Sequence, residues 1–517
     1  MTASRVESAA DRSRTKAVDL ERWVADVLNR WPAVGLAVGI VRDGALDDFH
    51  GHGVADITSR TPITEDTGVR VASISKTITG VAVMELWEQG AIDLDAPAND
   101  VLRAFRLVAT DPSWRPATIR DLLTHTAGLP ETAVSRRALM PDFGESVKLG
   151  QPIPTLAEYY GGNLRLVAEP GTRFRYGNHS FATLGQIVED VSGEPLHRYL
   201  REHIFEPLGM DDTDLLRTPA VESRLATGYE MSRRGPKEVE PRQMVTAGAA
   251  SVYSTPRDMA RYVAAMLGGG SNEHGSVLKP ETVAMMFAPQ YQPDPLIAGM
   301  GLAFFRADLG GRPAVEHQGT LPGFHSQLFL SPDDGVGVIA FTNGSWRPDF
   351  WLPYEVSGLL RRVLGIPEDP IRTDVPRRPE TWPDLCGWYR VSGPFTDLRV
   401  RAMAGAGAEV LVRGGQLILR MLTPVPTFYR GFPLLPEDPE DPYVFRVDLA
   451  EHGLGSMRVV FRQDEGRTTR MHLEVMPMTL HKGPDATNPR RWATGAAVGV
   501  AALAAGRRVV RARGSGG

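Results

Sequence analysis

The chain has 517 residues, of which 42% are hydrophobic and 23% charged, a composition typical of a soluble globular protein with room for two or more domains. Lys and Arg total 57 against 62 Asp and Glu, which gives a net charge of -5 and makes nucleic acid an unexpected partner. The single cysteine, Cys386, excludes an internal disulfide framework and leaves too little sulfur for a thiolate zinc site.

The two ends of the chain differ in character. Residues 1–17 are polar and of mixed charge, without the apolar run of a secretory signal, so we expect a disordered leader and a cytoplasmic protein. Residues 483–517 form a basic tail rich in Ala and Gly, in which residues 492–505 are apolar and flanked by arginines. This stretch is shorter than the roughly 20 residues that span a bilayer. Two interpretations stay open: weak membrane association through the tail, or a tail that is disordered or packed on the surface.

The spacing of apolar residues predicts a first domain over residues 18–364. Asp43-Gly44 lies between two strand-like runs and predicts a tight hairpin, and four further strand-like runs lie between residues 302 and 343. Strands at both ends with helices between them indicate one sheet with helices on its faces. Helical spacing predicts helices over 18–31, 73–89, 119–124, 181–191, 195–204 and 256–267.

A proline-rich stretch marks the end of this domain. Residues 365–383 contain five prolines and predict a stiff linker. Residues 384–482 are rich in strand-like runs, with Gly414-Gly415 placed where a tight hairpin turn would be. They predict a small antiparallel β domain, either a sandwich or barrel-like.

The first pattern that could support chemistry is VASISKTITG, in which Ser73 and Lys76 are three residues apart at the start of a predicted helix. That spacing places both side chains on one face, one turn apart. A lysine can remove the proton of a serine when burial or nearby cations lower its pKa, and the N–H groups of a helix start can stabilise an oxyanion. Taken alone, the pattern is better explained by an N-cap serine beside a solvated lysine.

Two further patterns come later in the chain. In FRYGN, Tyr176 and Asn178 precede a predicted helix; the phenol could share the proton of a nucleophile, and the amide could orient the lysine or a substrate carbonyl. In EHQGT, His317 and Gly319 lie on a predicted strand. The glycine would let a substrate backbone approach, and the histidine could donate a hydrogen bond or carry charge depending on pH. Considered one at a time, Tyr176 could equally be a packing residue and His317 a structural histidine.

The combination and order of these patterns are more specific than any one pattern alone. SxxK, YxN and HxG occur in this order, with TIRDLLTHTAGLP, AEPGTRFRYGN, HIFEPLGM and TAGAASVYSTPRDMARY between them, and so resemble the serine β-lactamase and penicillin-binding-protein superfamily. The resemblance is strongest to its class C β-lactamase-like branch, which includes family VIII carboxylesterases, D-alanyl-D-alanine carboxypeptidases and D-aminopeptidases. It covers residues 20–364 and implies an α/β fold with an antiparallel sheet flanked by helices and an all-helical region. The β-rich domain resembles the lipocalin-like appendages of some of these hydrolases.

The resemblance implies a serine hydrolase that needs no metal or cofactor. Ser73 would attack a carbonyl to form an acyl-enzyme, with Lys76 and Tyr176 relaying its proton. The oxyanion hole would be the backbone N–H groups of Ser73 and Thr320, and Asn178 would contact Lys76 and the substrate amide.

One departure concerns the substrate. Many relatives carry a lysine where His317 stands, and a neutral histidine anchors a carboxylate less well. The small-molecule or peptide substrate could therefore be an ester, an amide, a D-amino-acid peptide or a β-lactam. We expect His125 to be a buried, hydrogen-bonding loop residue and His325 to line the cleft mouth. The alternative function is a catalytically weak module of the same fold that binds peptides or peptidoglycan fragments.

Overall fold

The computed structural model describes residues 18–131, 144–367, 370–391, 406–423, 425–474, 476–484 and 488. The predicted leader 1–17 and the apolar stretch 492–505 lie outside them. The chain divides into two compact units between Pro370 and Ile371, and Leu449–Gly455 belongs to the first unit. The division falls within the predicted linker, whose second half contributes η8 (Pro379–Thr381) and the start of α12 (Trp382–Leu385) to the second unit.

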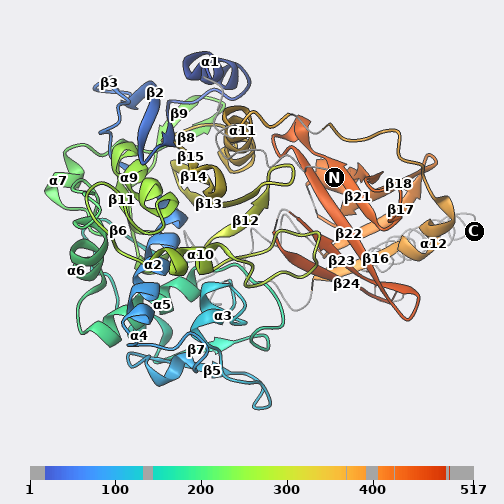
Figure 1. Ribbon diagram of the computed structural model, residues 1–517, viewed down its shortest axis with the longest axis horizontal. Coiled ribbons are helices and arrows are strands. Elements are labelled where there is room, and N and C mark those ends of the chain that lie inside the picture. The colour runs from blue at the N-terminus through green and yellow to red at the C-terminus, as the bar shows by residue number, and fades with distance from the viewer. Residues whose placement is uncertain are drawn as a thin grey trace, which may run out of the picture. The chain divides into compact units, whose positions relative to one another are not determined.

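The first unit contains the predicted sheet, built from both ends of the unit (Figure 1). Its seven strands follow the order β12-β13-β14-β15-β1-β2-β3, and all its neighbouring strands are antiparallel. The predicted turn is present: Asp43 and Gly44 both have positive φ, which the tight hairpin between β1 and β2 requires. The strands are β1 (Gly35–Arg42), β2 (Ala45–Asp56), β3 (Thr61–Pro62), β12 (Phe305–Asp308), β13 (Pro313–Leu321), β14 (Phe324–Ser331) and β15 (Val336–Thr342).

Helices cover both faces of this sheet because the central strands are apolar on both sides. In β1, Leu36 and Val38 face a cluster that includes α1 (Leu20–Arg30) and α11 (Pro348–Val363), whereas Ala37 and Val41 face a cluster that includes α9 (Pro256–Leu267). Figure 1 shows these two helical layers with the sheet between them. The prediction of an antiparallel sheet flanked by helices is confirmed.

The helical part of the unit is arranged around α2, which is apolar on nearly every side and almost wholly buried. The sequence predicted this helix from Ser73, but the structure begins with the short 3-10 turn η2 (Ala72–Ile74) and continues as α2 from Ser75. Helix α2 ends at Glu88. The other helices are α3 (Ile119–Leu123), α4 (Leu156–Tyr160), α5 (Asn178–Ser192), α6 (Leu196–Leu200), η6 (Arg201–Phe205), α7 (Pro219–Glu222), α8 (Ala247–Ala250) and α10 (Pro280–Phe287). Short strand pairs join β4 (Val69–Arg70) to β11 (Tyr253–Ser254), β5 (Arg106–Ala109) to β7 (Asn163–Leu166), β6 (Ser146–Lys148) to β10 (Arg242–Met244) and β8 (Tyr229–Ser232) to β9 (Gly235–Glu238).

The second unit is a single antiparallel sheet of nine strands in the order β19-β18-β17-β16-β24-β23-β22-β21-β20. Its two edge strands are separated by Leu434 alone, so the ends of the sheet meet and the unit is barrel-like. The predicted Gly414-Gly415 turn joins β17 to β18, and both glycines have positive φ. Helix α14 (Pro426–Arg430) precedes β19. The strands are β16 (Gly387–Val391), β17 (Ala408–Arg413), β18 (Gln416–Met421), β19 (Phe432–Pro433), β20 (Leu435–Pro436), β21 (Val444–Asp448), β22 (Ser456–Asp464), β23 (Arg467–Leu473) and β24 (Met478–Lys482).

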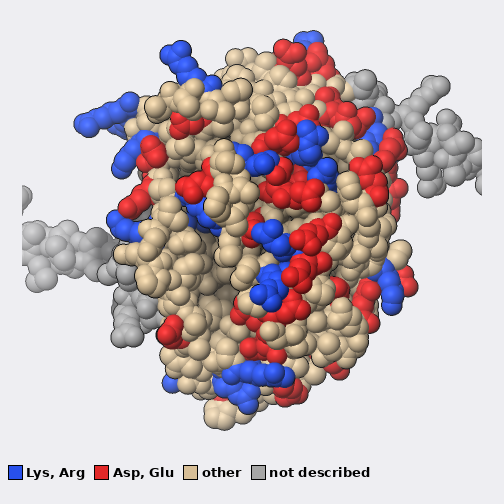
Figure 2. Space-filling view, turned by 90° about the vertical axis from the view of Figure 1, so that its left-hand side faces the viewer, with Lys and Arg blue, Asp and Glu red and all other residues tan. Residues whose placement is uncertain are grey.

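Acidic and basic side chains occur together on the surface. On the face drawn in Figure 2, Lys and Arg lie among Asp and Glu over much of the area. Ion pairs such as Arg257 with Asp66 and Arg372 with Asp374 are examples of this mixing.

Within the part of the chain that the structure describes, no helix is long and apolar enough to cross a bilayer.

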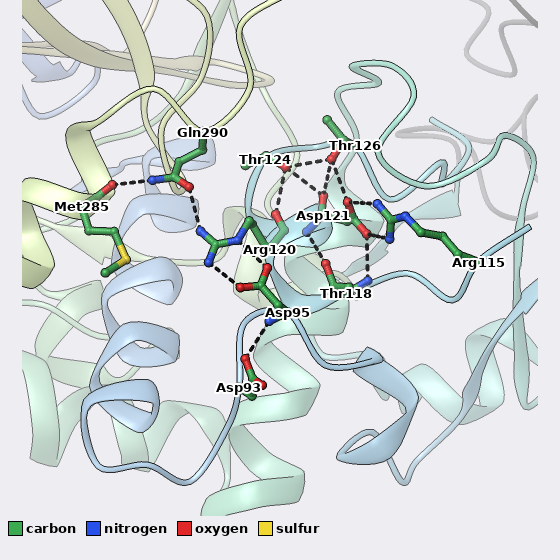
Figure 3. A network of polar contacts seen from close by, with 10 residues as sticks. All are labelled: Asp93, Asp95, Arg115, Thr118, Arg120, Asp121, Thr124, Thr126, Met285 and Gln290. Atoms are coloured by element: carbon green, nitrogen blue, oxygen red, sulfur yellow. Dashed lines mark hydrogen bonds and ion pairs between the residues drawn. The ribbon is translucent and has the colours of Figure 1, made fainter.

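A polar network fixes α3 and the loop that follows it (Figure 3). The Asp121 carboxylate accepts hydrogen bonds from Arg115 at 2.7 and 2.9 Å, from the Thr118 backbone at 2.9 Å and from the Thr126 hydroxyl at 3.3 Å. On the other side of α3, Arg120 binds Asp95 and the side chain of Gln290.

The loop after α3 in turn holds the segment that leads to Tyr176. The carbonyl groups of His125, Thr126 and Gly128 accept backbone hydrogen bonds at 2.8 Å from Arg175, Gly171 and Val167 respectively. The network of Asp121 therefore also fixes the approach to the YxN pattern.

The two aspartates of this network make a matched pair for a stability test. Asp121→Ala removes a buried carboxylate and leaves several donors unpaired, so we expect the free energy of unfolding to fall by about 2–4 kcal/mol. Asp95→Ala removes an exposed partner of Arg120 and should cost less than about 1 kcal/mol. Urea denaturation of wild type and both variants measures the difference, and equal losses would contradict this account of the network.

Candidate active site

Ser73 lies in η2, directly before α2. The residue before it, Ala72, has a φ of 50°, a left-handed conformation that is unusual for a residue with a side chain. The bend is held from two sides: the Ser75 hydroxyl donates to the Ala72 carbonyl at 2.6 Å, and the Ser326 hydroxyl of β14 donates to the Val71 carbonyl at 2.7 Å. The serine therefore stands on a fixed, sharply bent segment instead of on a regular helix.

Lys76 is fully buried beside this serine. Its Nζ donates three hydrogen bonds: to Ser73 Oγ at 2.9 Å, to Asn178 Oδ1 at 2.8 Å and to the backbone carbonyl of Ala249 at 3.0 Å. Burial lowers the pKa of Lys76 to about 7, although the Glu145 carboxylate acts in the opposite direction. The side chain can therefore exchange a proton with the serine near neutral pH.

Tyr176 contacts both Lys76 and Ser73. Its ring centroid is 5.0 Å from Lys76 Nζ, and its hydroxyl shares a hydrogen bond with the Ser73 side chain. Burial raises the pKa of the Tyr176 phenol above its usual value, so the phenol keeps its proton at neutral pH. The ring packs against His125 at 4.6 Å and Phe305 at 6.1 Å between centroids.

Asn178 is the first residue of α5 and links the lysine to a buried carboxylate. While its Oδ1 accepts from Lys76, its Nδ2 donates to Glu145 Oε2 at 2.7 Å. The expected contact between Asn178 and Lys76 is present, and Glu145 is an additional member that no sequence pattern indicated. Ala249, whose carbonyl binds Lys76, lies in the TAGAAS stretch but carried no signal of its own.

His317 faces the same group of rings from β13, with centroids 6.4 Å from Tyr176 and 5.5 Å from Phe305. Its Nδ1 donates to the Gln318 carbonyl at 2.7 Å, so Nε2 is left as an acceptor in the neutral ring. Burial lowers the pKa of His317 to about 3. Of the two roles expected for His317, donating a hydrogen bond and carrying charge depending on pH, Nδ1 has the first, while the lowered pKa favours a neutral ring near pH 7 with Nε2 as an acceptor.

Gly319 allows a close approach, but to the chain itself. A Cβ at this position would lie 2.3 Å from the Val71 carbonyl oxygen, 2.2 Å from Ser326 Oγ and 3.1 Å from Ala72 Cβ. The glycine therefore lets β13 lie against the bend that carries Ser73, and the expected approach of a substrate backbone stays a prediction.

Thr320, the second expected oxyanion-hole residue, lies on β13. Glu316 is the last β13 residue that pairs with β12, so Thr320 lies past the end of that pairing. Its hydroxyl donates to Asp349 Oδ1 at 2.5 Å, and Gln318 Nε2 donates to the Asp349 carbonyl at 2.9 Å. His325 Nε2 is 3.4 Å from the same carboxylate. The first turn of α11 thus anchors the HQGT stretch through Asp349, which no sequence pattern indicated.

His125 is buried and its backbone is hydrogen-bonded, as expected of a hydrogen-bonding loop residue, but within the described ranges its side chain does not take part. Among the described residues neither ring nitrogen has a partner, and the ring packs against Phe174, Tyr176 and Phe181. Burial, with Lys76 nearby, lowers the pKa of His125 well below its usual value. Its backbone has a φ of 56°, and the ring serves as an uncharged packing surface for Tyr176.

The chain is similar to known proteins over most of its first unit. The profile of the beta-lactamase family matches residues 20–350. Protein Rv1367c of Mycobacterium tuberculosis is 32% identical over 258 residues, covering 45% of this chain and 62% of that protein, so this chain spans less than two thirds of its length. The beta-lactamase of Yersinia enterocolitica is 25% identical over 351 residues, covering 60% and 82% respectively. The unguisins hydrolase of Aspergillus campestris is 25% identical over 366 residues, covering 68% and 66%.

Solved structures share the fold of this chain. The octameric penicillin-binding protein homologue from Pyrococcus abyssi matches with a TM-score of 0.58 at 23% identity, covering 90% of this chain and all of that one. SurE matches with a TM-score of 0.59 at 19% identity, covering 90% and 98%. The family profile, the arrangement of the sheet and helices and these structures agree: the chain belongs to the beta-lactamase family.

Proposed function

We propose that the protein is a serine hydrolase that forms an acyl-enzyme on Ser73 with an ester, an amide or a D-amino-acid peptide. The observation that carries this proposal is the contact of 2.9 Å between Lys76 Nζ and Ser73 Oγ. Because burial lowers the pKa of Lys76 to about 7, a large fraction of the lysine is neutral at physiological pH and can act as a base.

In the proposed reaction, Ser73 Oγ bonds to the substrate carbonyl carbon while its proton passes to neutral Lys76. The Tyr176 phenol, hydrogen-bonded to the same serine, passes a proton to the leaving group as the carbonyl–leaving-group bond breaks. The backbone N–H groups of Ser73 and Thr320 stabilise the oxyanion. Lys76 then returns the proton it took from Ser73 to the Tyr176 phenolate, which restores both groups. Water attacks the acyl carbon and passes a proton to neutral Lys76, while the bond from the acyl carbon to Ser73 Oγ breaks and Tyr176 protonates Oγ. Lys76 again reprotonates Tyr176, the acid leaves, and the serine hydroxyl is restored.

The surroundings of His317 bear on the choice of substrate. A buried, neutral ring with an accepting Nε2 offers a hydrogen-bond acceptor to a substrate N–H or O–H group and repels a carboxylate lone pair. This favours neutral acyl donors and amides over substrates that need a cation at this position. The Aspergillus campestris relative is named a hydrolase, which supports the proposal of a hydrolytic reaction for this chain.

A small-molecule or peptide substrate is the partner that this site would take, and we propose no nucleic acid partner. Weak membrane association through residues 483–517 stays a proposal. Its test compares the membrane-bound fraction of the full chain with that of a variant without residues 492–517. A catalytically weak binding module of the same fold is the alternative function, and the labelling experiment below separates the two.

The first prediction concerns covalent labelling at Ser73. A fluorophosphonate probe should label the wild-type protein, and Ser73→Ala should abolish the label because the attacking oxygen is gone. Lys76→Met should slow labelling by about 10²–10⁴-fold, the usual contribution of a general base. Ser192→Ala, at the far end of α5, is the control and should label normally. Absence of any label that depends on Ser73 would favour the binding module.

The second prediction concerns pH. If neutral Lys76 is the base, kcat/KM for a p-nitrophenyl ester should rise with pH, with a midpoint near the Lys76 pKa of about 7. Below that pH the lysine is protonated and activity should fall about tenfold per unit. The measurement runs from pH 5 to pH 9, with the rate of Ser73→Ala subtracted. A profile that is flat or declines over this range would contradict the role given to Lys76.

A further inference from the structure

A buried carboxylate lies behind the proton-transfer residues of the proposed hydrolase. We propose that Glu145 is a positioning residue: it fixes the amide of Asn178 so that its oxygen faces Lys76, and thereby holds the lysine against Ser73. This inference rests on the proposed function and adds a residue that acts through Asn178 and touches neither substrate nor serine.

The polarity of the hydrogen bonds determines the orientation of the amide. A carboxylate can only accept, and an ammonium group can only donate. Asn178 lies between the two, with 2.7 Å from its Nδ2 to Glu145 Oε2 and 2.8 Å from Lys76 Nζ to its Oδ1. The reversed amide would place N–H groups against the ammonium and an oxygen against the carboxylate, so the charge of Glu145 selects the productive orientation.

The carboxylate is itself held in place. Only 5% of the Glu145 side chain is exposed, and a charge at this depth is costly unless it is hydrogen-bonded and paired. His179 Nε2 lies 3.5 Å from Glu145 Oε1, and His179 Nδ1 lies 3.0 Å from the Tyr160 hydroxyl. His179 on α5 therefore lies beside Oε1, the carboxylate oxygen that Asn178 does not bind, and Tyr160 on α4 holds the His179 ring.

Among the described residues around Lys76, Glu145 is the counter-charge; Glu316 on β13, whose pKa burial raises to about 7, acts on Tyr176. His125 after α3, His179 on α5 and His317 on β13 each have a pKa lowered by burial, so they are neutral near pH 7. The pKa of Tyr176 is raised, so this residue is neutral as well. Glu145 is the charge that opposes the effect of burial on the pKa of Lys76.

Replacing Glu145 by residues that keep or lose its charge tests the inference. Glu145→Gln keeps the size and an accepting oxygen but removes the charge, so the pKa of Lys76 should fall further. The acid limb of the kcat/KM profile should then move to lower pH by roughly one unit. Glu145→Asp keeps the charge and should leave the limb at its wild-type position, with a lower plateau. Glu145→Ala frees the amide and should lower the plateau by about tenfold or more.

Glu355→Gln is the matched control. Glu355 on α11 is similarly buried, with 10% of its side chain exposed, and pairs with Arg30 of α1. Both helices pack on the face of the sheet opposite α9. The Glu355→Gln variant should leave the pH profile of kcat/KM unchanged. Thermal melting checks that each variant is folded. A Glu145→Gln limb that coincides with the wild-type limb, or a Glu145→Asp limb that moves with Glu145→Gln, overturns the inference. The proposed function is judged separately, by Ser73-dependent labelling of the wild-type protein.

Discussion

The interaction on which the site depends is the burial of the Lys76 ammonium among three oxygen acceptors. A lysine without solvent is tolerable only if each of its protons is bound, and here the acceptors are Ser73 Oγ, Asn178 Oδ1 and the Ala249 carbonyl. They come from η2, α5 and α8, so the fold must bring three distant segments to one point. The same burial lowers the pKa of the lysine, and the packing of the fold thereby supplies the proposed base.

The sheet contributes the opposite wall of the site. β13 lies against the bend before Ser73 because Gly319 has no Cβ to collide with Val71. Ser326 on β14 binds that same bend, and Asp349 at the start of α11 binds Thr320. Backbone contacts and short polar side chains thus fix Ser73 and the proposed oxyanion strand β13 to one another. They restrict movement between the attacking oxygen and the oxyanion donors, whose relative position determines the rate of the reaction.

Sequence patterns predicted the fold further than they predicted the details of the site. The Asp43-Gly44 hairpin, the central helix and the late strands follow from periodicity and turn chemistry, and the structure confirms them. The tautomer of His317 could not be predicted, because it depends on which carbonyl group lies nearest to Nδ1 in three dimensions. Glu145 and Asp349 had no distinguishing neighbours in the sequence, and only the fold places these carboxylates beside Asn178 and Thr320. Gly319 was singled out, but its close contact is with Val71, about 250 residues away along the chain.

The most direct test of the central claim is the titration of Lys76 itself. The chain contains only six lysines, so a protein labelled with ¹³C at the lysine Cε position gives a small set of NMR signals that can be followed from pH 5 to pH 11. The account predicts that one signal, missing in Lys76→Met, titrates near pH 7, far below the ordinary lysine pKa of about 10.4. A Lys76 signal that titrates near that ordinary value would contradict the account, because the buried lysine would then be fully charged at neutral pH and unable to act as a base.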